Sequence, residues 1–216
     1  SISRFGAKME RTGQTLTRNV TLPLAGLGIA AVKMASDFEE TDSKFKTVFS
    51  SIQKQAENTA HTFKNSFGLS SKAAKQMLGD TGDLLVGFGF TEKEALNLSK
   101  QVNELAVDLA SFTNFSGGAE GASLALTKAL LGERESIKSL GIAITEADLK
   151  SFAKDQGLIL KELTRVEKAT LTYQLAAKQS SKAIGDFART SGSFANQTRI
   201  LVNQITDLGI ELGQQL

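Results

Sequence analysis

The sequence has no cysteine and no tryptophan, and its 216 residues include a single histidine, a single proline and a single tyrosine. The lack of cysteine excludes disulfides, thiolate metal sites, iron–sulfur clusters and cysteine nucleophiles. His61 alone cannot build a multi-histidine zinc site, and any serine triad would have to use it. We therefore expect a protein that is not an enzyme and that needs no metal or cofactor.

The scarcity of proline and the choice of aromatic residues favour helices. Phenylalanine occurs 13 times, and a ring without a polar group suits dry contacts between helices. Long helices exclude proline from their interiors. With 41% hydrophobic residues the chain can bury a core. We predict an all-α fold of amphipathic helices joined by glycine-containing turns, a compact or elongated helical bundle that also self-associates through coiled coils.

Charge is nearly balanced, with 25 basic and 23 acidic residues and a formal net charge of +2. Residues 1–36 and 151–200 each carry an excess of basic side chains. Neither stretch has a run of Lys or Arg, or aromatic residues placed for base stacking. We expect no sequence-specific binding of nucleic acid, and ordinary solvated helix faces account for both stretches.

Apolar residues recur at steps of three, four and seven in three stretches, a spacing that predicts one apolar face on each helix. The middle stretch follows a capping box formed by Thr91 and Glu94. We predict that these faces are seams for helix packing or for partners. They comprise Phe38, Phe45, Phe49, Ile52 and Phe63, then Leu98, Val102, Leu105, Leu109 and Phe112, and last Leu201, Ile205, Leu208 and Leu212.

Glycines and capping residues predict where helices begin and end. Gly68 is placed as a C-cap, and Gly79–Gly82 is expected to end the short helix 72–78. A second capping box, Thr164 with Glu167, predicts a helix that reaches about Ile184. Further predicted elements are a helical turn at 83–90 and helices at 92–115, 119–131, 133–140 and 145–157.

The pattern divides the chain into three predicted segments. Residues 1–36 form a basic N-terminal helix and an apolar joint, residues 37–186 a helical core region, and residues 187–216 a C-terminal amphipathic helix. The apolar face of this last helix is still open at Leu216, so we expect it to continue into a longer chain.

The joint has two interpretations. No charge falls between Arg18 and Lys33, but this stretch is shorter than the roughly 20 apolar residues that span a bilayer. Pro23, Gly26 and Gly28 also weaken a helix here. One interpretation is a buried, flexible joint between helices. The alternative is membrane contact through Leu22, Leu24, Leu27, Ile29 and Val32.

Four blocks of sequence resemble the tape measure proteins of long-tailed bacteriophages and prophages. The first is LGERESIKSLGIAITEADL at 131–149, and the second is VTLPLAGLG at 20–28 followed by ASDFE at 35–39. The third is GFGFT at 87–91 with LAVDLASF at 105–112, and the fourth is GDFARTS at 185–191 leading into ANQ at 195–197. Together they span nearly the whole chain in order.

The resemblance implies a long helical protein that is threaded through the growing tail tube, sets its length and is released at genome ejection. It implies partners in the tail tube protein, tail assembly chaperones, tail tip or baseplate proteins and other copies of the chain. The location implied is the lumen of the virion tail, and the host cytoplasm during assembly. At about 1.5 Å of rise per residue, a wholly helical chain of this length would cover about 320 Å. The alternative role is a membrane-active segment that helps DNA cross the host inner membrane.

Overall fold

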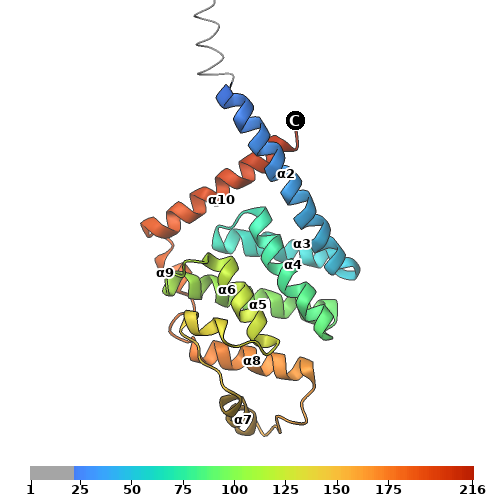
Figure 1. Ribbon diagram of the computed structural model, residues 1–216, viewed down its shortest axis with the longest axis vertical. Helices are drawn as coiled ribbons and strands as arrows, with labels where there is room; N and C mark the ends of the chain where they lie inside the picture. The colour runs from blue at the N-terminus through green and yellow to red at the C-terminus, as the bar shows by residue number, and fades with distance from the viewer. Residues whose placement is uncertain (1–21) are drawn as a thin grey trace, which may run out of the picture. The chain divides into compact units, whose positions relative to one another are not determined.

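The computed structural model describes residues 22–216, and this part of the chain contains nine α-helices, two short 3₁₀ helices and no strand (Figure 1). The predicted all-α class is thereby confirmed. The α-helices are α2 (Leu22–Val48), α3 (Gln53–Phe67), α4 (Ser71–Phe88), α5 (Glu92–Phe112), α6 (Gly118–Leu130), α7 (Glu146–Asp155), α8 (Arg165–Gln179), α9 (Asp186–Thr190) and α10 (Phe194–Gly213). The 3₁₀ helices are Ser50–Ile52 and Ser136–Leu140.

Contacts divide the described residues into two compact units. One unit is Thr41–Gln204, and the other combines residues 22–40 with residues 205–216. These limits differ from the segments predicted from the sequence at 36 and 186, because α2 and α10 each run through both units.

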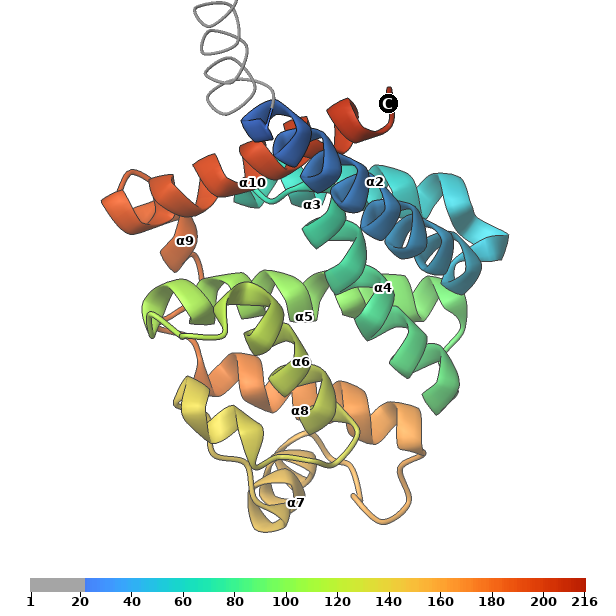
Figure 2. The same cartoon turned by 45° about the horizontal axis from the view of Figure 1, so that its top comes forward.

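The unit Thr41–Gln204 is built around α5. This helix packs against α4 and α6 and also contacts α3, α8 and α9 (Figure 2). Twelve of its residues are buried, among them Leu98, Val102, Leu105 and Leu109. Phe45, Phe49 and Phe63 belong to the same core, and Ile52 packs against it while partly exposed. These predicted seam residues therefore pack within the chain.

Helix α4 runs unbroken from Ser71 to Phe88, so the predicted end at Gly79–Gly82 is wrong. Gly79 and Gly82 are buried. Their lack of a side chain leaves room for the rings of Phe45, in α2, and Phe49, directly after α2. A Cβ atom at Gly82 would lie 2.3 Å from Cζ of Phe49, and one at Gly79 would lie 3.6 Å from Cα of Phe45. Burial of these rings outweighs the helix penalty of a glycine, which is about 1 kcal/mol.

Other boundaries also differ from the sequence-based prediction. The apolar face predicted from Phe38 to Phe63 is interrupted between α2 and α3, where the backbone N–H and the hydroxyl of Ser51 donate to Oε2 of Glu92 at 2.9 and 2.7 Å. These hydrogen bonds hold the pKa of Glu92 below its usual value. Helix α8 ends at Gln179 instead of near Ile184, and only Ser136–Leu140 of the stretch 133–140 is helical.

Part of the predicted joint near Pro23 lies outside the described residues, and in the described part α2 begins at Leu22 and continues through Gly26 and Gly28 without a break. A proline in the first turn of a helix removes no intrahelical hydrogen bond, since the first N–H groups have no partner there.

Both predicted capping boxes are present, at the starts of α5 and α8. A third, formed by Thr145 and Asp148, starts α7. In the first box the Thr91 hydroxyl and backbone N–H donate to the Glu94 carboxylate at 2.7 and 3.0 Å, which lowers the pKa of Glu94. Gly68 is the C-cap of α3 as predicted, with a left-handed φ of 59°.

Polar side chains form a buried cluster between α4, α5 and α6. Asn103 of α5 donates to the backbone carbonyl of Met77 at 3.0 Å and is bonded to the hydroxyl of Ser123. The hydroxyls of Thr81 and Thr127 lie 3.1 Å apart. Because buried polar groups cost free energy unless they are hydrogen-bonded, this cluster fixes how the three helices align.

A charged cluster joins α2, α3 and α4 at the edge of the same unit. Nζ of Lys75 lies 2.7 Å from Oε1 of Glu57 and also contacts the carboxylate of Asp42. Burial raises the pKa of Asp42, but hydrogen bonds from Lys46 and Lys75 outweigh it and the net shift is downward. The Lys75 side chain is only 13% exposed, so this pair is screened less than a surface ion pair.

The contact between Gly82 and Phe49 predicts opposite effects for two alanine substitutions on α4. Gly82→Ala places a methyl group against a fully buried ring, and we expect it to lower the free energy of unfolding by about 1–3 kcal/mol. The methyl group of Gly87→Ala has no atom within 4 Å, so this substitution should raise the free energy of unfolding by up to about 1 kcal/mol. Urea denaturation followed by circular dichroism measures both, and equal effects would contradict this packing.

Candidate partner-binding site

Helix α10 has two faces with different surroundings. On one face, Asn196 and Ile210 are buried and Ile200 and Asn203 are partly buried. On the other, Leu201, Ile205, Leu208 and Leu212 are each between 50% and 64% exposed, and Phe194 is 89% exposed. We call these five exposed residues the α10 row. It is the third of the seams predicted from the sequence, with Phe194 added.

The first half of α10 is held against the unit Thr41–Gln204 by specific contacts. The side-chain amide of Asn203 donates to the backbone carbonyl of Gly68 at 3.0 Å. Ile200 packs so closely on Gly68 that a Cβ atom there would lie 2.6 Å from it. Asn196 donates to the hydroxyls of Thr190 at 2.9 Å and Ser111 at 3.3 Å. These contacts use the face opposite the α10 row.

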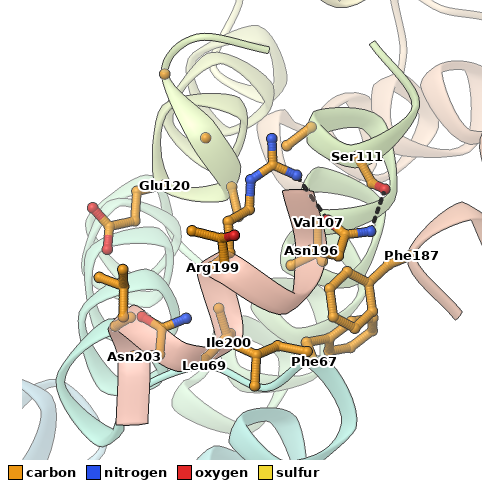
Figure 3. Close-up of a pocket in the computed structure, with 17 residues that line it drawn as sticks. Phe67, Leu69, Val107, Ser111, Glu120, Phe187, Asn196, Arg199, Ile200 and Asn203 are labelled. Atoms are coloured by element: carbon orange, nitrogen blue, oxygen red, sulfur yellow. Dashed lines mark hydrogen bonds between the residues drawn. The ribbon is translucent and has the colours of Figure 1, made fainter. Parts of the chain in front are cut away.

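A cavity of about 320 Å³ lies beside this half of α10 (Figure 3). Its apolar lining includes Phe67, Val107, Phe187 and Ile200. Arg199, also in the lining, donates to the side-chain oxygens of Asn196 at 2.8 Å and Asn114 at 3.0 Å. Beside the cavity, α10 therefore remains linked to α5 and the residues after it, through the hydrogen bonds from Asn196 to Ser111 and from Arg199 to Asn114.

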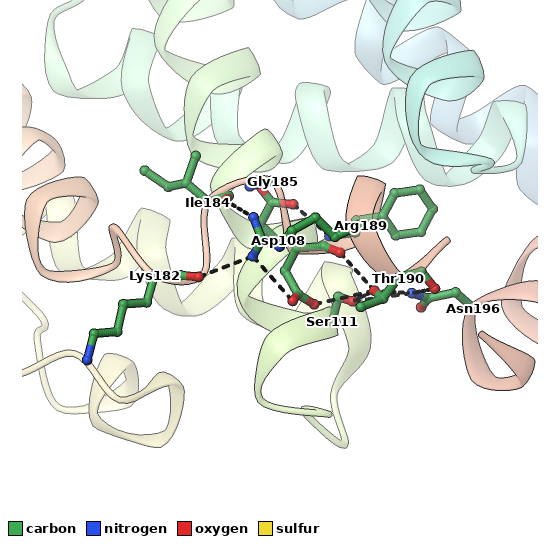
Figure 4. A network of polar contacts seen from close by, with 10 residues as sticks. Asp108, Ser111, Lys182, Ile184, Gly185, Arg189, Thr190 and Asn196 are labelled. Carbon is green, nitrogen blue, oxygen red and sulfur yellow. Dashed lines mark hydrogen bonds and ion pairs between the residues drawn. The ribbon is translucent and has the colours of Figure 1, made fainter. Parts of the chain in front are cut away.

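Asp108 anchors the segment that leads into α10 (Figure 4). This buried carboxylate on α5 accepts hydrogen bonds from the backbone N–H groups of Gly185 at 2.6 Å and Phe187 at 3.1 Å. The guanidinium of Arg189 donates to the backbone carbonyl of Ile184 at 2.8 Å on the same segment. Through Asp108 the core helix fixes where α9 starts, and therefore where α10 follows.

The second half of α10 belongs to the other unit, where it crosses α2. A Cβ atom at Gly213 would lie 2.0 Å from the carbonyl oxygen of Ala31, and one at Gly209 would lie 2.4 Å from the sulfur of Met34. Small residues at both positions allow the two backbones to approach closely. Ile210, on the same side of α10, is 4% exposed. The α10 row is again left uncovered.

Two other predicted seam residues do not join the core. Phe112, at the end of α5, is 53% exposed, unlike the four seam residues before it. Phe38 on α2 is partly buried and lies in the unit formed by residues 22–40 and 205–216.

The candidate membrane residues are described only in part. The side chains of Leu22, Leu24 and Leu27 lie outside the described residues, whereas Ile29 and Val32 are exposed on α2. Among residues 22–216, no helix is both long enough and apolar enough to cross a bilayer. The same residues hold no group of three His, Asp or Glu side chains arranged for a metal ion.

Sequence reasoning missed Asp108 and Asn196. The helical spacing of the apolar residues places Asp108 outside the predicted seam, but Asp108 lies inside the apolar stretch LAVDLASF at 105–112, and an acidic residue flanked by apolar ones is a signal of burial. Asn196 lies in the first turn of α10 and has no local feature that distinguishes it from other helix asparagines.

Comparison with family models, with curated proteins and with solved structures finds no match to this chain.

The Asp108 contacts predict a stability effect. Asp108→Ala leaves two backbone N–H groups without their acceptor, and we expect the free energy of unfolding to fall by about 2–4 kcal/mol. Asp83→Ala is the control, because this exposed carboxylate only pairs with Lys44 at 3.4 Å and its loss should cost less than about 0.5 kcal/mol. Similar losses in the two variants would show that Asp108 is not an anchor.

Proposed function

We propose that this chain is a segment of a phage tail tape measure protein, a helical ruler and scaffold that sets tail tube length during assembly. The observation that carries the proposal is the α10 row, an exposed apolar face at helical spacing on an all-helical protein. Contiguous exposed apolar surface marks sites where proteins associate. The tail tube protein, assembly chaperones, tail tip or baseplate proteins and other copies of the chain are its proposed partners.

The positions of the resembling blocks support the proposal. The block at 105–112 supplies Asp108, and the block at 185–191 supplies the N–H groups that Asp108 binds. The block at 131–149 runs from the end of α6 through Ser136–Leu140 into α7, where Ile137, Leu140, Ile142 and Leu149 are buried. These residues have packing roles, which is what a structural protein of the virion requires.

The ruler predicts that added residues lengthen the tail. Leu158 and Ile159 are exposed between α7 and α8, so an insertion there should leave the fold intact. About 40 added helical residues correspond to about 60 Å. We expect tails of the parental phage, measured by electron microscopy, to lengthen by about that amount. An unchanged melting temperature of the purified chain is the control for an intact fold. Normal-length tails that contain the longer chain would contradict a ruler.

A second candidate function, membrane activity of the N-terminal segment, has one observation in its favour. Ile29 and Val32 are exposed on α2, so an apolar surface is present on that helix. An amphipathic helix of this kind can lie in the interface of a bilayer without spanning it.

The two functions make different predictions for a peptide of residues 11–36. If the segment only packs against other helices, dye-loaded vesicles of anionic lipid should stay intact at micromolar peptide. Dye release that is lost in the Ile29→Glu, Val32→Glu peptide would instead assign membrane activity to this surface. We expect intact vesicles, because the uncharged stretch between Arg18 and Lys33 is shorter than the roughly 20 apolar residues that span a bilayer.

A further inference from the structure

The α10 row follows a heptad pattern. Leu201 and Leu208 occupy d positions, Ile205 and Leu212 occupy a positions, and Phe194 is one heptad before Leu201. Asn196, Asn203 and Ile210, which are covered, fall at f on the far side of the helix, and Ile200, which packs on Gly68, falls at the neighbouring c position. The chain therefore uses the outer face of a coiled-coil helix for its own packing and leaves the a and d face exposed.

The residue types at these positions indicate how many helices would pair. A β-branched residue at a together with leucine at d favours two parallel strands over three or four. The a positions are Thr198, Ile205 and Leu212, of which the first two are β-branched, and Leu201 and Leu208 at d are leucines. Because α10 is already folded and held by Asn196, Asn203 and Ile210, pairing would not have to pay for forming the helix.

The flanking positions carry almost no charge. Gln197, Gln204 and Glu211 occupy g, and Ala195, Val202 and Gly209 occupy e. In a parallel, in-register pair, each g residue faces the e residue of the next heptad in the other helix. The single charge, Glu211, then faces Leu216, so no like charges meet when two identical helices pair. Selection of a different, oppositely charged partner would need charges at these positions, and they are missing.

We propose that the α10 row pairs two copies of this chain as a parallel, in-register, two-stranded coiled coil. The proposal names the partner of the surface on which the proposed function rests. Leu201, Ile205, Leu208 and Leu212 of one chain meet the same residues of the second chain.

Light scattering during size-exclusion chromatography of the whole 216-residue chain tests the number of copies. We expect the mass of a dimer, and we expect the double variant Leu201→Glu, Leu208→Glu to weaken dimerisation at least about tenfold. Leu124→Glu is the matched control, because Leu124 is a leucine on α6 that is 51% exposed. Circular dichroism must show the same helicity in all three proteins. A monomer at about 100 µM, a trimer, or equal weakening by the control would overturn the proposal.

Single cysteines test the direction and register, since the chain has none of its own. In a parallel, in-register pair Leu208→Cys lies next to itself, so we expect it to oxidise to a disulfide dimer at least about tenfold faster than Leu124→Cys. An antiparallel pair would instead join Leu201→Cys to Leu212→Cys in a mixture of the two variants. Preferential formation of that mixed dimer, or equal rates for positions 208 and 124, would overturn the parallel arrangement.

These measurements use only the purified chain. A monomer would leave the tail-length result standing, and a tail whose length ignores inserted residues would leave the dimer standing. Failure of this inference is therefore distinguishable from failure of the proposed function.

Discussion

Because a buried polar group costs free energy unless it is hydrogen-bonded, two buried polar side chains constrain how other helices pack on α5. Asn103 and Asp108 are both buried on it and both are hydrogen-bonded, Asn103 to α4 and α6 and Asp108 to the segment before α10. Each bond can form in only one alignment of the helices concerned. Apolar packing alone would allow the helices to slide, whereas these two residues fix α4, α6 and α9 around α5.

This constraint extends to the surface. Asp108 fixes the start of α9, and Ser111 on the next turn of α5 reaches Asn196 at the start of α10. The face of α10 that carries Asn196 must therefore point toward α5. Because the a and d positions lie on the opposite face, the polar anchors inside the unit Thr41–Gln204 determine that Phe194 and Leu201, the row residues of this unit, are exposed. This part of the candidate partner site is therefore a consequence of the hydrogen bonds that Asp108 and Ser111 accept.

Local features were predictable from the sequence, and long-range ones were not. The boxes at Thr91 and Thr164 and the C-cap at Gly68 depend on residues within one turn, so their residue types identify them. The continuity of α4 through Gly82 depends on Phe49, which is distant in sequence and whose ring needs the space. No reading of residues 79–82 alone could have distinguished a helix break from a site of close packing.

The same limit applies to the candidate site. Leu98, Val102, Leu105 and Leu109 have the same spacing as Leu201, Ile205, Leu208 and Leu212. The first four are buried and the last four are exposed. The spacing of apolar residues indicates that a helix has an apolar face. Whether that face is covered depends on the other helices that pack around it. Charge at the neighbouring e and g positions does not distinguish the two helices either, because Asp108 is the one charged residue at these positions between Leu98 and Phe112 in α5, and Glu211 is the one between Leu201 and Leu212 in α10.

The compact unit Thr41–Gln204 and a role as ruler place opposite demands on the chain. In the folded unit, residue number does not translate into length, because α3 to α8 pack against one another instead of following end to end. To extend, the chain must separate α5 from α4 and α6, which exposes Leu96, Val102 and the polar cluster around Asn103. That separation costs on the order of the unfolding free energy, about 5–15 kcal/mol for a domain. It can be offset only if partners cover the exposed faces, so a ruler built from this sequence must draw its extension energy from the tube or from other copies of itself.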